Sequence, residues 1–244
     1  MKQTLFGCFL VAIAIVSCKD KPVVVPPVVD PGISYLTMDS GTIWNYQVDN
    51  ITDTLTTSTN YSLEASNEDT TINTRIYKIF HRTDTSGYHS DYFNVTVNEY
   101  FQYARLNSKL PTTELKYLVN NAPLGTSWED PFVITQNQAG VTVTVNATLR
   151  NSVEEKGSSV TVDSVTYDNV IKIKTEVINP TITSSIPIPL SIEPITQNIY
   201  AYYAPKYGLI KKEFQLNVDV NALGTIQNFI NTNKVTKLIS TNIP

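Results

Sequence analysis

The chain has 244 residues, with 18 Lys and Arg against 22 Asp and Glu, and a formal net charge of −4. No basic block interrupts this mild acidity, so the clustered Lys/Arg footprint that nucleic acid binding needs is absent. The two cysteines, Cys8 and Cys18, both lie within the first 18 residues, which excludes a disulfide framework and thiol chemistry in the rest of the chain.

The N-terminus is a short apolar segment behind a basic residue. Lys2 precedes the uncharged run from Leu5 to Val16. A helix of about a dozen residues reaches roughly 18 Å, well short of the ~30 Å hydrocarbon core of a membrane. A basic start followed by a short apolar region is typical of a secretory signal peptide.

Ile15-Val16-Ser17-Cys18 resembles the lipobox of bacterial lipoprotein signal peptides. The resemblance implies cleavage between Ser17 and Cys18, a diacylglycerol on the Cys18 sulfur, and a further acyl chain such as palmitate on its new amino group. Two or three acyl chains hold a protein firmly, whereas one chain binds only reversibly. We therefore expect residues 1–17 to be removed and Cys18 to anchor the protein. The alternative is an uncleaved signal with a buried thiol.

Residues 18–32 are expected to form a tether after the lipidated cysteine. Four prolines lie among valines in this segment: Pro22, Pro26, Pro27 and Pro31. Prolines at this density favour an extended polyproline II chain of ~3.1 Å per residue. An edge strand is the competing interpretation, but the prolines remove too many hydrogen-bond donors. The tether would lead to a single all-β domain at residues 33–244.

The long C-terminal part shows the pattern of β-strands. Apolar and polar residues alternate at residues 141–150, 171–174 and 213–220. This period of two predicts antiparallel strands with one face on a core and the other in water. Polar turn signals occur at residues 85–87, 137–140, 155–158 and 167–169.

The predicted fold class is mainly β: a twisted antiparallel meander that forms a half-barrel or barrel-like sheet, with at most one or two short helices. The best helical candidate is Ala222 to Asn231, which Gly224 weakens. The sequence Gly-Thr-x-Trp occurs twice, at Gly41–Trp44 and Gly125–Trp128. Either it marks two similar halves, 33–120 and 121–244, or it repeats by chance.

Two longer motifs carry a family resemblance. Y-L-x-x-x-x-G-T-x-W-x-Y runs from Tyr35 to Tyr46, and Y-Y-A-x-x-x-G-L-I-K-K-E runs from Tyr202 to Glu213. With the lipobox and tether, they resemble a broad set of uncharacterised Bacteroidetes-type outer-membrane lipoproteins. The resemblance implies a lipid anchor in the outer membrane, on its periplasmic or surface face, and a sheet similar to the half-barrels of lipid and lipoprotein carriers. It also implies a tight turn that needs Gly208, and it brings no catalytic residues.

The resemblance also implies a modification. Such bacteria O-glycosylate exported proteins at Asp followed by Ser or Thr, and the acceptors here would be Thr54, Thr70 and Ser164. The pattern is short, and chance matches are expected in a chain so rich in threonine.

A search for catalytic chemistry finds little. His81 and His89, with Asp91, fall short of the three or four fixed ligands of a zinc site, so we expect no metal and no cofactor. No Gly-x-Ser-x-Gly occurs. Adjacent carboxylates such as Glu154 and Glu155 should point to opposite faces of a strand and cannot flank one bond. We therefore expect no catalytic residue and no enzyme; an enzyme acting on carbohydrate or peptide is the weakest alternative.

Residues 179–198 are an unusually apolar connection between two expected strands. Its large apolar residues are Ile186, Ile188, Leu190, Ile192 and Ile195. It could be a ligand lid, a surface for a partner, or a cover for an open sheet edge, and long apolar loops are often functional.

Two functions remain open for the β domain. The first is a non-enzymatic envelope lipoprotein with a binding or structural role toward a hydrophobic small molecule, a glycan or an envelope protein. The second is a carrier or sensor of a hydrophobic, lipid-like ligand in a half-barrel cavity. An apolar space of ~300 Å³ or more near residues 186 to 195 would favour the carrier.

Overall fold

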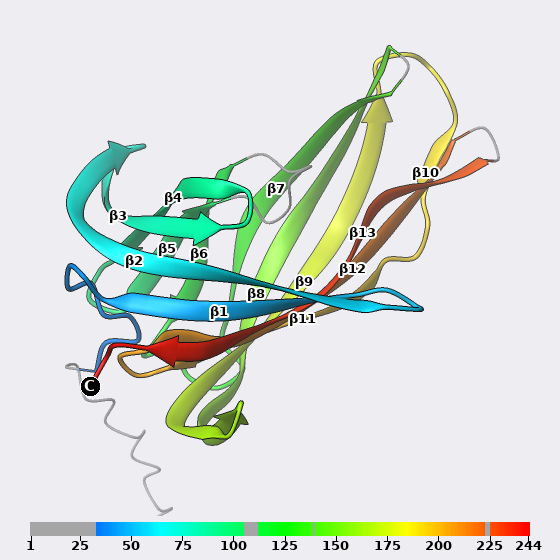
Figure 1. Cartoon of the computed structure of the whole chain (residues 1–244). Helices are drawn as coiled ribbons and strands as arrows, with labels where there is room; N and C mark the ends of the chain where they lie inside the picture. Colours follow the sequence, from blue (N-terminus) through cyan, green and yellow to red (C-terminus); the bar gives the residue numbers. More distant parts are fainter. Residues whose placement is uncertain (1–32, 105–111, 139, 223–224) are drawn as a thin grey trace, which may run out of the picture. The chain divides into compact units, whose positions relative to one another are not determined.

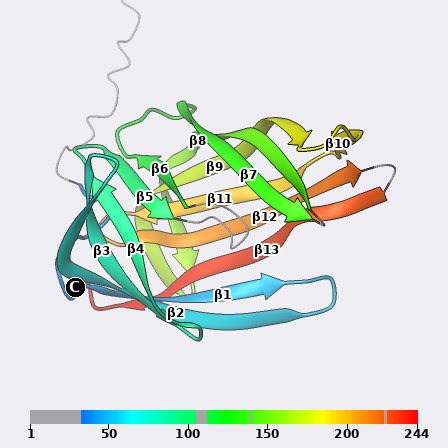
Figure 2. The ribbon, with the colours of Figure 1, turned by 90° about the horizontal axis from the view of Figure 1, so that it is seen from above.

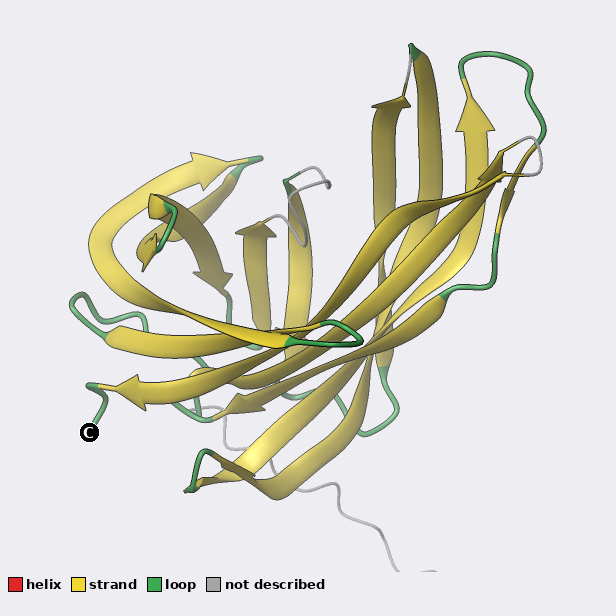
Figure 3. Cartoon of the chain, turned by 45° about the vertical axis from the view of Figure 1, so that its right-hand side comes forward, coloured by secondary structure: helices red, strands yellow, loops and turns green. Residues whose placement is uncertain are grey.

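The computed structural model describes residues 33–104, 112–138, 140–222 and 225–244, which belong to one compact unit. The expected signal peptide, Cys18 and the tether lie outside the described residues. The described residues form strands, turns and loops, and they contain no helix (Figure 3).

Thirteen strands follow one another within the described residues (Figure 1). They are β1 (Ile43–Ile51), β2 (Thr56–Ile72), β3 (Arg75–Asp84), β4 (Gly87–Val95), β5 (Glu99–Ala104), β6 (Thr113–Val119), β7 (Ser127–Gln138), β8 (Val141–Val162), β9 (Val165–Ser184), β10 (Leu190–Ile192), β11 (Thr196–Ala204), β12 (Gly208–Ala222) and β13 (Thr225–Thr241).

Twelve of these strands form one continuous antiparallel path, in the order β6-β5-β4-β3-β2-β1-β13-β12-β11-β9-β8-β7, and β10 adds to β12. The path curls until it is nearly closed into a barrel, with one unsealed seam between its end strands β6 and β7 (Figure 2). This confirms the predicted barrel-like meander. Pro131 lies in β7, as expected for an edge strand, because proline cannot donate to a second neighbour.

Side chains bridge the seam where the backbone ladder is missing. The indole Nε1 of Trp128 on β7 donates to the carbonyl of Lys116 on β6 at 2.6 Å, and Asn151 Nδ2 lies 3.4 Å from the same oxygen. Burial raises the pKa of the neighbouring Asp130 carboxyl. Side chains of β7 and β8 thus bind the β6 backbone at Lys116.

Two of the four predicted turns are wrong. Residues 155–158 lie inside β8, and residues 167–169 lie inside β9. Gly157 and Asn169 have φ angles of 78° and 56°, and the register shifts beside both. Each is an extra residue that bulges out of a continuing strand and bends it. The actual turn between the two strands is Asp163–Ser164, with φ angles of 47° and 72°.

The expected helix at residues 222–231 is also wrong. Ala222 ends β12, and Thr225 begins β13, so the segment is a hairpin whose tip, residues 223–224, lies outside the described residues. Its apolar residues Phe229 and Ile230 are both buried, because Phe229 is the extra residue at a register shift in the ladder with β12. A bulge therefore produced spacing that resembled a helical face.

The interior holds two apolar clusters. Core A fills the space between the first strands and β8, β9, β11 and β12, around fully buried Trp44, Phe80, Ile171 and Ile210. Core B lies between the long parts of β7, β8 and β9 and those of β12 and β13, and it contains Phe132 among others. Inward-facing alternate residues of the strands supply both cores, which is the arrangement expected for barrel-like sheets.

The two Gly-Thr-x-Trp copies form the same local structure. Gly41 N–H donates to the Ala65 carbonyl at 2.8 Å, and Gly125 N–H donates to the Val153 carbonyl at 2.8 Å. Both glycines have positive φ angles, 83° and 79°. In each copy the threonine carbonyl accepts the return bond, at 2.9 and 3.0 Å. A duplication of the whole halves remains a hypothesis.

The late motif from Tyr202 to Glu213 forms the β11–β12 hairpin turn. Gly208 has a φ of 70°, and a Cβ there would lie 3.1 Å from Leu36 Cδ1. Lys206 binds the segment before β1 through its backbone: its N–H donates to Ser34 at 2.8 Å and its carbonyl accepts from Thr37 at 3.1 Å. The turn therefore fastens the N-terminal end of the domain to the barrel.

Candidate ligand-binding site

The wall of the barrel is split between β9 and β11. The two strands pair only from Thr175 opposite Ile199 to Ile171 opposite Tyr203. At the next position the Gln197 side chain replaces the backbone ladder: its Oε1 accepts from Val177 N–H at 2.6 Å and its Nε2 donates to the Val177 carbonyl at 3.2 Å. Beyond this bond β9 continues without β11 beside it.

A groove of about 650 Å³ lies at this split. Val177–Pro180 and Ile182 of β9 line one wall, and Ile192–Ile195 line the other. Most of these side chains are apolar, and Glu193 is the one charged residue among the described residues of the lining. Asn179 has a φ of 51° at a register shift, so β9 bulges where it borders the groove. The volume of the groove is within the range of small-molecule binding sites.

A smaller cavity of about 80 Å³ lies inside the barrel. Side chains from seven strands line it: β5, β6, β7, β8, β9, β11 and β12. They come from both cores, and apolar residues such as Phe132, Leu149 and Phe214 dominate. Val177 is common to the lining of the cavity and that of the groove, so the two spaces lie on either side of this residue.

Lys212 projects into this cavity. It lies in the inward-facing row of β12, between Ile210, which is 0% exposed, and Phe214, which is 8% exposed. Its Nζ is 5.2 Å from the centre of the Phe214 ring, and burial lowers the pKa of the ammonium group. No carboxylate in the described residues lies within ion-pair distance of it. The sequence interpretation began this row at Phe214 and missed the lysine two residues earlier.

The neutral polar residues of the cavity are partly engaged with one another. Thr175 Oγ1 donates to Asn151 Oδ1 at 2.7 Å, and Asn151 is 7% exposed. The Gln102 side chain also lines the cavity. Asn151, Thr175 and Gln102 thus add neutral polar groups to a lining that is mostly apolar.

The predicted lid residues divide into two groups. Ile186 is 44% exposed in the loop before β10, and Ile188 is partly buried there. Leu190 and Ile192 lie on β10, opposite Ala222 and Val220 of β12. With Ile195, they pack against core B.

The segment from 185 to 195 therefore runs along β12 beyond the end of its pairing with β11 at Asn217. This is the geometry of an edge cover, and the same segment borders the groove through Ile192 and Ile195. A lid function stays a prediction.

The structure does not bring His81 and His89 together. His81 is opposite Ser90 in the β3–β4 ladder, whereas His89 is opposite Arg82, so the two rings face opposite sides of the sheet. His89 Nε2 is 2.9 Å from Ser86 Oγ. No group of three potential metal ligands forms within the described ranges.

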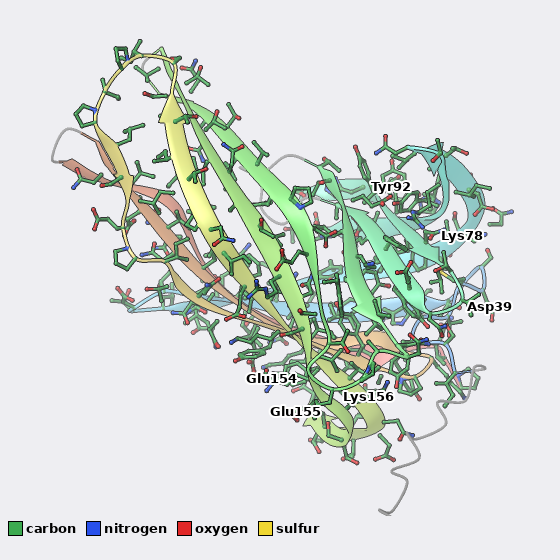
Figure 4. All side chains as sticks on the ribbon, turned by 180° about the vertical axis from the view of Figure 1, so that it is seen from behind. Asp39, Lys78, Tyr92, Glu154, Glu155 and Lys156 are labelled. Atoms are coloured by element: carbon green, nitrogen blue, oxygen red, sulfur yellow. The ribbon has the colours of Figure 1, made fainter. Side chains whose placement is uncertain are left out.

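The expectation that Glu154 and Glu155 point to opposite faces of the strand is wrong. Both carboxylates contact Lys172, at 3.5 and 2.9 Å, because a register shift between Val153 and Glu155 turns the neighbours to one side (Figure 4). The rule that neighbouring side chains alternate fails at a bulge. Lys172 supplies one positive charge between the two carboxylates on the outer wall.

The predicted glycosylation acceptors occupy different settings. Thr54 is exposed in the β1–β2 turn, and Ser164 is exposed in the β8–β9 turn. Thr70 lies on β2 and is partly buried. Whether they carry glycans stays a prediction.

In comparisons with family models, curated proteins and solved structures, nothing matches this chain. Within residues 33–244 as far as they are described, no helix has the length and hydropathy needed to cross a membrane. The functional argument therefore depends on the geometry of the groove and the cavity.

Proposed function

We propose that this is a lipid-anchored outer-membrane protein of the cell envelope, on the periplasmic or surface face, whose β domain binds a hydrophobic small molecule without catalysis. Cys18 would carry the anchor, and the ligand would lie in the groove between β9 and β10. Carriage or sensing of that ligand is the role that fits such a site.

The observation that carries the proposal is the groove itself. Its volume of about 650 Å³ falls within the ~300–1,000 Å³ that small-molecule sites occupy. It lies where the β9–β11 ladder ends, and the Gln197 side chain there bonds both the N–H and the carbonyl of Val177. Its walls are mainly isoleucine, valine and proline, which favours an apolar ligand over a sugar.

The test is ligand binding with the groove filled. Ile195→Trp would place a large ring in the groove, and we expect it to weaken binding of a C16 chain by at least tenfold. The matched control is Val133→Trp, because Val133 is an exposed apolar residue on β7, outside the lining. Titration of both full-length variants with hexadecanol, followed by calorimetry, gives the comparison.

Native mass spectrometry of the protein from its own host adds a second measurement. We expect a bound lipid-like molecule on the wild-type chain and its loss in Ile195→Trp. Unchanged affinity in Ile195→Trp, or a wild-type chain that binds no apolar molecule, would contradict the proposal.

A further inference from the structure

We infer that the interior cavity binds the carboxylate of a long-chain amphiphile, with Lys212 as its counter-ion, while the hydrocarbon tail lies in the adjoining groove. This inference rests on the proposed function and adds the chemical class of the ligand.

The first argument is the position of Lys212. The inward-facing row of β12 continues with Phe214, Leu216, Val218 and Val220, all of which are at most 8% exposed. Lys212 is itself only partly buried, but its ammonium group lies beside apolar side chains, which costs free energy unless water or an anion compensates it. Charged groups of this kind occur preferentially at functional sites.

The second argument is the missing partner. On the outer wall, half-buried lysines have carboxylate partners: Lys172 with Glu155 at 2.9 Å, and Lys211 with Glu213 at 2.6 Å. Lys212 has no such partner in the described ranges. A bound anion would give Lys212 the negatively charged partner that Lys172 and Lys211 already have.

The third argument is the charge of the whole cavity. Among its described lining residues, Lys116 and Lys212 are the charged ones, and no acidic residue is present. Lys116 already pairs with Glu99 at 3.0 Å, so Lys212 supplies the free positive charge. Amide groups of Asn151 and Gln102 lie in the same lining and could donate to a carboxylate.

The fourth argument is size. The cavity of about 80 Å³ has room for a carboxylate. The groove of about 650 Å³ shares Val177 with it and has room for a hydrocarbon chain. The two spaces therefore suit an amphiphile with a small anionic head.

The test compares palmitate with hexadecanol, which has the same chain length and no charge. Full-length protein is stripped of lipid and titrated with each ligand by calorimetry. We expect the wild type to bind palmitate at least tenfold more tightly than hexadecanol. Lys212→Met should lose this preference and keep its hexadecanol affinity, and Lys212→Arg should retain the preference.

The matched control is Lys211→Met, on the same strand but facing outward, and it should behave as the wild type. Circular dichroism of each variant verifies folding. Carboxyl-¹³C-labelled palmitate gives a second readout, since its carboxylate should stay ionised to lower pH in the wild type than in Lys212→Met.

The outcomes separate the two proposals. Equal affinity of the wild type for both ligands, or a preference that survives in Lys212→Met, would refute the role of Lys212 while leaving the apolar groove intact. Binding of neither ligand would refute the proposed function and this inference together.

Discussion

Replacing Lys212 by Met should stabilise the ligand-free protein. Met keeps the length and the apolar character of the lysine stem, but it loses the contact between the ammonium group and the Phe214 ring, which are 5.2 Å apart. No hydrogen bond or ion pair of the described residues is lost, because the ammonium group has no carboxylate partner. The substitution also removes the free-energy cost of holding a charge in a mainly apolar cavity. We expect a gain of about 1–2 kcal/mol in the free energy of unfolding, the usual range for relieving a functional compromise.

The stability difference between the wild type and Lys212→Met should depend on pH. Burial lowers the pKa of Lys212 below its ordinary value of 10.5, so the folded state loses this proton before the unfolded state does. The stability of the wild type should therefore rise as pH increases through the lowered pKa toward 10.5. The advantage of Lys212→Met should be greatest near neutral pH and shrink at alkaline pH.

Urea unfolding of the wild type, Lys212→Met and Lys211→Met at pH 7 and pH 10 measures these differences. Lys211→Met loses only the partly exposed pair with Glu213 and should stay within about 0.5 kcal/mol of the wild type. A Lys212→Met variant that is clearly less stable than the wild type at pH 7 would refute the reasoning, since it would mean that the lysine has a stabilising partner.

Three further perturbations test other parts of the structure. Gly208→Ala should lower the free energy of unfolding by about 2 kcal/mol and Gly125→Ala by about 1 kcal/mol, as measured by thermal unfolding. Both glycines have positive φ angles, but only a Cβ at position 208 would contact neighbouring atoms. Equal losses would contradict the close approach at Gly208. Cys18→Ser should remove the lipid label and shift the protein out of the membrane fraction without changing its circular dichroism, and a variant that kept its label would overturn the anchor. Hydrogen bonds from Ser58 and Gln47 lower the pKa of Asp49 from 3.8 to about 2, so Asp49→Asn should cost about 1 kcal/mol at pH 7, and this cost should shrink as the pH falls from about 4 through 2; a cost that is unchanged between pH 7 and pH 2 would show that charge is not its origin.

The strands could be predicted from sequence where alternation was clean. Residues 141–150 and 213–220 alternate because one face meets core B and the other faces outward, and this pattern was enough for the fold class. The bulges could not be distinguished from turns. Gly157 and Asn169 carry the residue types of a turn, and only the partner strand, far along the chain, determines that the strand continues.

The candidate site was less accessible to sequence reasoning. Lys212 lies two residues before Phe214, so the alternation places it on the same inward face as Phe214 and Leu216. A lysine at the end of an alternating run, however, is usually interpreted as the start of a solvent-exposed segment. The split between β9 and β11 depends on pairing between Thr175 and Ile199, and no local property of either strand shows where that ladder ends. The segment 179–198, which the sequence singled out, includes residues 192–195 of the groove lining; its function stays a prediction.

The most direct test of the central claim is to locate a bound chain. Palmitate carrying a photoreactive diazirine near its methyl end is added to full-length protein, irradiated, and the labelled peptides are sequenced by mass spectrometry. The account predicts labels within Val177–Ile182 and Ile192–Ile195, competed away by unlabelled palmitate and absent in Ile195→Trp. Labels elsewhere on the barrel, or labelling that excess palmitate does not reduce, would contradict it.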